Sequence, residues 1–349
     1  MGQSEDACMA SRASRSDRCV TRPRPPPRAC PARAACLFWL RTLSLAFLEE
    51  PRMRTTDVAR HDEARCIWPA RAVLGEGPFW MATEGALYWL DIPGRKVHRL
   101  ELQSGAQASW DTPLRIASLA PRRSGGFIAG TERGLAFYEP RSARLERLLD
   151  PEPEHPHNRC NDGKVDPQGR FWVGTMDDHE EAPTGGLYRF DAQGHLARID
   201  EGYTVTNGPA FSPDGRTLYV NDSPRRVTYA FDLSPDGAAS RRREFLRFDE
   251  PHGFPDGMTA DAEGGLWIAF YGGGCVRRFS PDGAWLAEYR LPVAKTTSVA
   301  FAGDALDRLF VTTGRDGLSA EELEAQPLAG GLFELTPGVR GVAPVPFAG

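Results

Sequence analysis

Short apolar runs recur at an even spacing along most of this 349-residue chain. Counted from the residue named with each, they lie 40, 44, 47, 48 and 43 residues apart. The runs are ALYWLD at Leu87, GGFIAG at Phe127, GRFWVG at Phe171, RTLYVND at Leu218, GGLWIAF at Leu266 and DRLFVTT at Leu309. A second run that ends in a turn follows each of them, as in GLAFYEP and VTYAFDLSPDG. Aromatic and β-branched residues bounded by Gly, Pro and Asp are typical of β-hairpins.

Six such units, with no long helical pattern between them, predict an all-β fold that is a six-bladed β-propeller. A β-sandwich and a two-domain β protein are the alternatives, and neither explains so even a spacing. We expect the propeller to occupy residues 57–349. We also expect strands near its two ends, at 67–73 and 342–349, to pair and close the ring, because closure removes exposed sheet edges.

Polar residues precede the apolar runs at a common offset of ten or eleven positions. In a propeller the first strand of each blade lines the central channel, so equal offsets place side chains at equal heights on the axis. The residues at this offset are Glu76, Asn161, Asn207, Asp256 and Ser298, while the second repeat has Ile116 with Ser118 nearby. Gly or Pro stands beside each of the first four and lets the backbone bend there.

Two carboxylates and two amides from four blades form an all-oxygen cluster. Hard divalent cations bind such ligands, Ca²⁺ and Mg²⁺ first, with Mn²⁺ or Zn²⁺ as alternatives. The competing interpretation is that Asn and Asp only cap turns here, which suits one residue better than four at one offset. The sequence therefore predicts an axial metal site.

The charge is unevenly distributed along the chain. The net charge of −5 offers no basic excess that would predict nucleic-acid binding. Residues 1–56 carry +5, which leaves −10 for the rest, and they contain the Pro/Arg-rich stretch TRPRPPPRACPARAAC. We interpret residues 1–56 as a disordered or non-native extension, with Met53 as the working start. The apolar run 36–48 could instead belong to a targeting segment, but it is too short to span a bilayer.

The spacing of the cysteines and the absence of common catalytic motifs argue against several classes of site. Seven scattered Cys without CxxC spacing argue against a disulfide framework and a zinc site, so we expect a cytoplasmic protein with reduced thiols. The sequence has no GxSxG elbow, Walker A loop, HExxH motif or EF-hand loop. These absences leave chemistry at the predicted axial site as the main hypothesis.

From Ala72 to Gly349 the chain resembles the regucalcin/gluconolactonase family of sugar lactonases, also called senescence-marker-protein-like. The matching segments include LGEGPFW, NRCNDGKVDPQGRFWVGTM, TNGPAFSPDG and FPDGMTADAEGGLWIAFYGGG. The resemblance covers about four-fifths of the chain. It implies a six-bladed propeller with one divalent metal at its axis.

The resemblance also implies roles for individual residues. The metal ligands fall on Glu76, Asn207 and Asp256, and Asp256 is in addition the implied general base. Arg159 and Asn161 are the implied substrate-binding residues. A further substrate contact falls within DDHEEAPTGG, where the candidates are Asp177, Asp178, His179 and Glu180, and we assign it to His179.

These roles imply a metal-dependent hydrolase that opens aldonolactones such as gluconolactone to aldonic acids. We expect one divalent metal, Ca²⁺ first, with Zn²⁺, Mn²⁺ or Mg²⁺ as alternatives. The expected partner is a small-molecule sugar lactone, without nucleic acid or membrane, bound to a monomer or weak homo-oligomer. Two other functions stay open: a calcium-binding regulatory protein without essential catalysis, and an aryl-ester or phosphotriester hydrolase on a similar propeller.

We expect residues 1–52 to be dispensable, because no strand repeat precedes Ala72. A chain shortened to begin at Met53 should keep the melting temperature and the lactone turnover of the full chain. Thermal unfolding and turnover, measured side by side, check this. A loss of several degrees or of turnover would show that the segment contributes to the protein.

Overall fold

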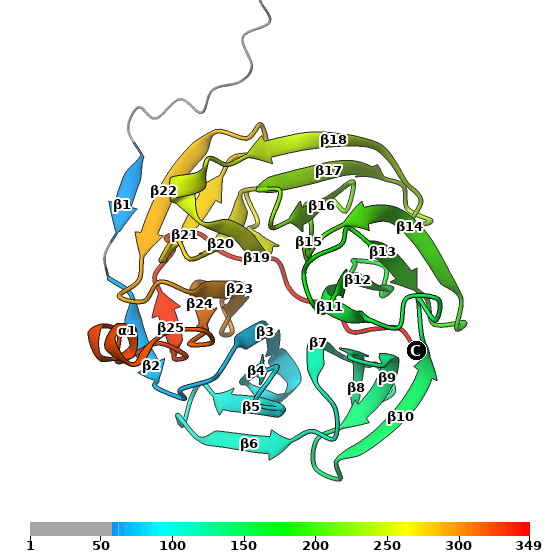
Figure 1. Ribbon diagram of the computed structural model, residues 1–349, viewed down its shortest axis with the longest axis horizontal. Coiled ribbons are helices and arrows are strands. Elements are labelled where there is room, and N and C mark those ends of the chain that lie inside the picture. Colours follow the sequence, from blue (N-terminus) through cyan, green and yellow to red (C-terminus); the bar gives the residue numbers. More distant parts are fainter. Residues whose placement is uncertain (1–57, 62) are drawn as a thin grey trace, which may run out of the picture. The chain divides into compact units, whose positions relative to one another are not determined.

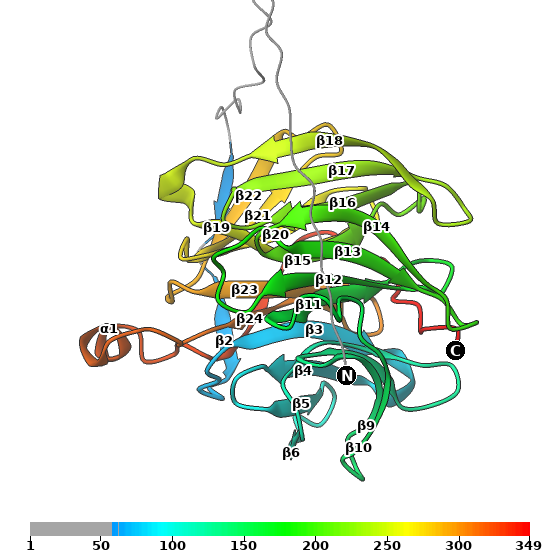
Figure 2. The ribbon, with the colours of Figure 1, turned by 45° about the vertical axis from the view of Figure 1, so that its right-hand side comes forward.

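Six antiparallel β-sheets are arranged around a common axis, as Figure 1 shows. The computed structural model describes residues 58–349 apart from Asp62, and the expected extension over residues 1–56 lies outside the described residues. Within the described part, the fifth blade gains an extra strand, β1 (Ala59–His61), which runs parallel to β22 (Trp285–Arg290) (Figures 1 and 2). The prediction of an all-β, six-bladed propeller is confirmed.

The first three blades each begin with the strand nearest the axis and step outwards along the chain. Their strands are β3 (Gly75–Met81), β4 (Ala86–Asp91), β5 (Lys96–Glu101) and β6 (Gln107–Asp111); β7 (Ile116–Pro121), β8 (Phe127–Thr131), β9 (Gly134–Glu139) and β10 (Arg144–Leu149); and β11 (Asn158–Val165), β12 (Phe171–Asp177), β13 (Gly185–Phe190) and β14 (Leu196–Tyr203). The apolar runs of the sequence are the second strands β4, β8 and β12, which are buried along their whole length. Continuous burial explains why these runs do not alternate.

The last three blades follow the same plan, except that the sixth takes its outer strand from the N-terminal side. Their remaining strands are β15 (Thr206–Phe211), β16 (Thr217–Asp222), β17 (Val227–Leu233) and β18 (Ala239–Arg247); β19 (Phe254–Ala260), β20 (Leu266–Tyr271) and β21 (Cys275–Phe279); and β23 (Thr296–Ala302), β24 (Arg308–Thr313), β25 (Leu332–Leu335) and β2 (Arg65–Trp68). Three short helices join them, η1 (Ala82–Glu84), η2 (Glu250–His252) and α1 (Ala320–Ala325). No helix in the described part of the chain is long and apolar enough to cross a membrane.

The ring closes in the sixth blade, where β2 pairs antiparallel with β25. The N-terminal strand lies close to the predicted range 67–73, but its partner is not the predicted segment 342–349. That part of the prediction was wrong, because Pro344 and Pro346 have no N–H to donate to a sheet ladder. The C-terminal segment instead lines a cavity at one end of the channel, and the N–H of Phe347 donates to a carbonyl of the second blade.

Apolar cores fill the spaces between neighbouring blades. Trp89 of the first blade packs in one cluster with Phe310 of the sixth. Trp172 of the third blade packs in another with Leu218 of the fourth. Both tryptophans are completely buried, and such large rings contribute much of the apolar area that stabilises the fold.

A buried aspartate in each of two blades fixes a turn to a core tryptophan. In the fifth blade one oxygen of Asp261 accepts hydrogen bonds from two backbone N–H groups of its own turn. The other oxygen accepts from Trp267 Nε1 at 2.8 Å and from Arg278 Nε at 2.7 Å. The same arrangement joins Asp166 to Trp172 in the third blade. The sequences DPQGRFW and DAEGGLW therefore encode one structural device twice.

Asp261→Ala should lower the free energy of unfolding by about 3 kcal/mol or more, because it leaves an indole N–H and a guanidinium without a buried acceptor. Urea unfolding measures this change. Asp214→Ala is the matched control, since it removes a carboxylate from an exposed turn and should cost only about 0.5 kcal/mol. Equal losses in the two variants would contradict the structural role of Asp261.

Candidate active site at the propeller axis

Every inner strand changes its register against the second strand at the residues that face the channel. Such a β-bulge bends the strand and re-aims its side chains. The shifts lie at Glu76/Phe79, Ile116/Ser118, Cys160/Gly163, Asn207/Ala210, Pro255/Met258 and Thr296/Ser298. The common sequence offset therefore corresponds to a common irregularity of the backbone.

Glycines beside these bulges allow the inner strands to approach one another. A Cβ at Gly257 would collide with the Ser298 hydroxyl of the next blade. Gly208 has a φ of 78°, and a Cβ there would lie 2.5 Å from the Met258 methyl group. Only glycine combines the positive φ with this small volume. Asn207 and Asp256, which precede these glycines, are held close to the axis as a result.

A cavity of about 310 Å³ opens at one end of the channel. Its lining brings together most of the residues predicted to form the site, namely Glu76, Arg159, Asn161, Asn207 and Asp256. Loop residues and the ends of two strands complete it, among them Glu180, Phe254, Tyr271 and Asp316. Ser298, which the offset also indicated, lines the cavity at the other end of the channel.

The two amides of the site are fixed in one chain of hydrogen bonds. Asn161 Nδ2 donates to Asn207 Oδ1 at 2.9 Å and to the Thr206 carbonyl at 3.0 Å. Asn207 Nδ2 donates to Ser223 Oγ at 2.8 Å, and that hydroxyl donates to the Pro255 carbonyl at 2.6 Å. These bonds orient the Asn207 oxygen toward Asn161 and tie the third, fourth and fifth blades together at the axis.

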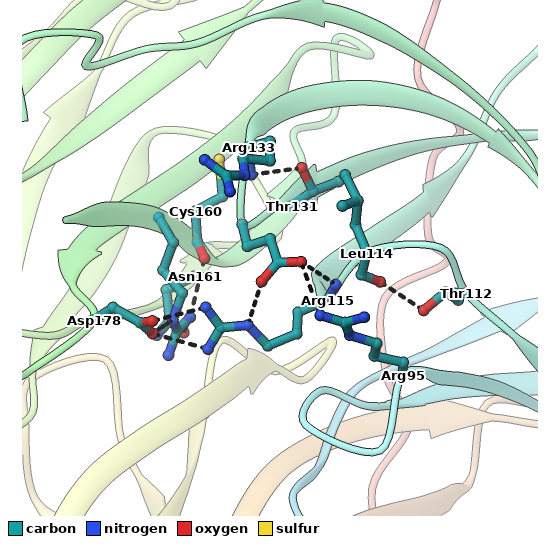
Figure 3. Close-up of polar contacts among 11 residues, drawn as sticks. Arg95, Thr112, Leu114, Arg115, Thr131, Arg133, Cys160, Asn161 and Asp178 are labelled. Atoms are coloured by element: carbon teal, nitrogen blue, oxygen red, sulfur yellow. Dashed lines mark hydrogen bonds and ion pairs between the residues drawn. The ribbon is translucent and has the colours of Figure 1, made fainter. Parts of the chain in front are cut away.

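Arg159 is held in the wall of the cavity, with only 11% of its side chain exposed. Its Nε donates to Asp178 Oδ1 at 2.6 Å, and its Nη1 donates to Asn161 Oδ1 at 2.8 Å and to the Cys160 carbonyl at 3.0 Å. Asp178 in turn accepts two hydrogen bonds from Arg115 (Figure 3). Within the described residues these contacts leave the Nη2 donors of Arg159 for a bound molecule.

Three buried carboxylates crowd the axis. Burial and the nearby charge of Asp162 raise the pKa of Glu76 to about 8. Burial, followed by the charges of Glu76 and Asp162, raises the pKa of Asp256 well above its usual range. Burial also raises the pKa of Asp162, to about 6. Such shifts show negative charge without enough compensation, which a divalent cation would supply.

The donor set at the cavity fits a hard cation. Glu76 and Asp256 supply carboxylate oxygens, and Asn207, which also lines the cavity, supplies an amide oxygen that accepts a hydrogen bond from Asn161. In the described part of the chain no three His, Cys, Asp or Glu side chains form a metal-binding group by themselves. An ion at the axis would thus depend on the amide ligand. Ligation by oxygen atoms alone favours Ca²⁺ or Mg²⁺ over softer metals that prefer thiolate ligands.

Sequence reasoning assigned no role to Asp162 and Lys164, which lie one step deeper in the channel. Asp162 accepts hydrogen bonds from the N–H of Gly163 at 2.7 Å and of Gly208 at 3.1 Å. Lys164 Nζ donates to the Met258 carbonyl at 2.6 Å, and burial lowers the pKa of this lysine. The adjacent polar residues in RCNDGK could have indicated Asp162, because a bulge can turn two successive side chains toward the axis.

His179 lies outside the lining of the axial cavity. It lines a neighbouring cavity instead, where its ring centroid is 5.4 Å from that of His157. The next residue, Glu180, lines the axial cavity. Contact between His179 and a sugar therefore stays a prediction, and of the four sequence candidates Glu180 is the one that lines the axial cavity.

Known proteins share this architecture and these motifs. Residues 74–315 match the family described as the SMP-30/Gluconolactonase/LRE-like region. The 6-deoxy-6-sulfogluconolactonase of Pseudomonas putida is 39% identical over 293 residues, which cover 83% of this chain and 100% of that protein. Regucalcin of Homo sapiens is 37% identical over 297 residues, with 81% and 98% covered. The crystal structure of a calcium-binding regucalcin from Agrobacterium tumefaciens matches with a TM-score of 0.80 at 30% identity and covers 83% of this chain and 99% of that one. This chain therefore belongs to the SMP-30/gluconolactonase family of sugar lactonases.

Proposed function

We propose that the protein is a metal-dependent hydrolase that opens aldonolactones to aldonic acids. The observation that carries the proposal is one cavity in which Glu76, Asn207 and Asp256 lie beside the fixed guanidinium of Arg159. The first three are the proposed ligands of a divalent metal, Ca²⁺ first, with Zn²⁺, Mn²⁺ or Mg²⁺ as alternatives. The calcium-binding regucalcin and the sulfogluconolactonase among its relatives support the metal and the substrate class.

The residues of the cavity have separate tasks in this proposal. A bound divalent ion would polarise the lactone carbonyl and stabilise the negative charge that develops on its oxygen. Asp256 accepts a proton from the attacking water, whose oxygen bonds to the carbonyl carbon. The bond from that carbon to the ring oxygen then breaks, and the ring oxygen takes up a proton to become a hydroxyl.

Arg159 and Asn161 hold the sugar ring while this occurs. Asp178 and Asn207 fix both side chains before any substrate arrives. The Nη2 donors of Arg159 and the Oδ1 acceptor of Asn161, whose own N–H groups are both occupied, then orient the carbonyl toward Asp256 at little further entropic cost. The product is an aldonic acid, and its carboxylate forms beside the metal site and Arg159.

The cellular setting follows from the thiols. Cys66, Cys160 and Cys275, the cysteines of the described residues, are free. Free thiols are typical of a reducing compartment, so we propose a cytoplasmic enzyme that acts on a small molecule as a monomer or weak homo-oligomer.

Calcium binding without catalysis is the second candidate function, favoured by the calcium-binding relative from Agrobacterium tumefaciens. The Arg159–Asn161 contact at 2.8 Å argues for catalysis. A site that only buffers an ion needs neither of these side chains oriented toward its cavity.

Lactone turnover should disappear on chelation and return with a divalent ion. A panel of aldonolactones, assayed by acid release after chelation and addition of Ca²⁺, Mg²⁺, Mn²⁺ or Zn²⁺, tests this. Full activity in protein shown by elemental analysis to be free of metal would contradict metal dependence. Tight Ca²⁺ binding without turnover of any lactone would favour the second candidate.

Asp256→Asn should keep an oxygen for the metal but lose the proton acceptor. Loss of a general base typically lowers the rate 10²- to 10⁴-fold, so kcat should fall by about that factor at saturating metal. The melting temperature of the metal-free protein should not fall, because the substitution removes one of the buried carboxylates that repel one another at the axis. Turnover within a few-fold of the parent, with metal occupancy confirmed, would show that Asp256 is a ligand only.

Arg159→Ala provides the contrast to this variant. It removes binding to the sugar more than to the reacting carbonyl, so it should chiefly raise KM. Arg159→Lys should recover only part of the loss, because a lysine lacks the planar fork of donors. If Asp256→Asn and Arg159→Ala changed kcat and KM in the same way, the separate roles proposed for the two residues would be contradicted.

A further inference from the structure

A second cavity, of about 180 Å³, adjoins the axial one. Arg159 lines both cavities, so its guanidinium stands between them. The rest of the second lining is rich in cationic and imidazole side chains, namely Arg115, Arg133, His157 and His179. Any molecule held by Arg159 at the axis therefore has this cavity within reach of its far end.

The charges around the second cavity do not cancel. Asp178 accepts from Arg115 Nη1 and Nη2 at 3.0 and 2.7 Å and from Arg159 Nε at 2.6 Å. Glu132 accepts from Arg115 Nε at 2.6 Å and lies 3.5 Å from a nitrogen of Arg95. With Arg133, which lines the same cavity, these residues amount to four guanidiniums and two carboxylates, and Figure 3 shows the contacts of Arg115 with Asp178. An excess of two positive charges remains.

Arg133 is the arginine of this cluster that keeps its side-chain donors free. Its backbone N–H donates to Thr131 Oγ1 at 3.0 Å, and its carbonyl accepts from Arg147, so the main chain is held in place. Arg133 is an exposed residue that lines the cavity, and its guanidinium has no acidic partner among the described residues. Arginine binds sulfonate, phosphate and carboxylate groups through paired N–H donors.

We propose that the second cavity is an anion subsite, and that the preferred substrate is a lactone with an anionic group on the carbon farthest from the carbonyl. The inference rests on the proposed lactonase function and specifies its substrate class. With the ring hydroxyls at Arg159 and Asn161, a substituent on the far carbon extends past Arg159 toward Arg133. Sulfonate, phosphate and carboxylate share the chemistry that this subsite recognises.

The test compares kcat/KM for gluconolactone with kcat/KM for the same lactone carrying a 6-sulfonate, a 6-phosphate or a C6 carboxylate. In the parent the best anionic lactone should exceed the neutral one by about tenfold, the worth of a charge-assisted hydrogen bond. Arg133→Ala should lower this ratio about tenfold through KM, Arg133→Lys should keep most of it, and added NaCl should reduce it. Arg340→Ala removes an exposed arginine near the C-terminus and should keep the parent ratio.

A parent ratio of one or less overturns the subsite while leaving the lactonase function intact, and so does a ratio that Arg133→Ala does not change. The three anionic lactones show which group the subsite prefers. If no lactone is turned over, the proposed function fails, and calorimetry decides the subsite separately. The 6-phosphorylated or 6-sulfonated aldonate should then bind more tightly than gluconate, and Arg133→Ala should abolish that advantage. Equal affinities would overturn the subsite.

Discussion

The burial of like charges at the propeller axis is the constraint on which the site depends. Glu76, Asp162 and Asp256 come from three blades, and all are more than nine-tenths buried. Burial raises the pKa of each carboxyl group, and the charges of neighbouring carboxylates raise those of Glu76 and Asp256 further, so the arrangement costs stability unless positive charge arrives. The apolar cores between the six sheets supply the stability that offsets this cost. The bulges of the inner strands bring the carboxylates together.

The two ends of the channel meet this constraint differently. On the deeper side Lys164 lies near Asp162, and its charge lowers the pKa of that carboxyl group against the effect of burial. The C-terminal residues 342–345 line the cavity at that end. On the other side Glu76 and Asp256 face the larger cavity, where Arg159 is the cationic side chain of the lining. A divalent ion would therefore stabilise the buried carboxylates most at the end of the channel that lacks a buried lysine.

Repetition made the fold and much of the site predictable. The even spacing located the second strand of every blade, and the common offset located Glu76, Asn207 and Asp256 because radial symmetry converts sequence position into height. Asp162 received no role because a strict two-residue alternation does not anticipate a bulge that brings two successive side chains to the axis. The position of His179 could not be derived, because the loop after β12 does not repeat from blade to blade. The pairing of β2 with β25 was also hidden, since periodicity does not say which end of the chain supplies the last strand.

The fifth blade shows how one side-chain type serves stability and function within a few residues. Asp261 is buried with backbone, indole and guanidinium donors on both oxygens, so its charge is fully used inside the fold. Asp256, five residues earlier, is buried beside two other carboxylates, and its backbone contact with Gly257 does not outweigh them. A carboxylate whose oxygens already accept hydrogen bonds from the protein serves to hold a turn. A carboxylate with too few such donors can bind an ion or accept a proton. The difference lies in the donors around each group, because both are buried aspartates.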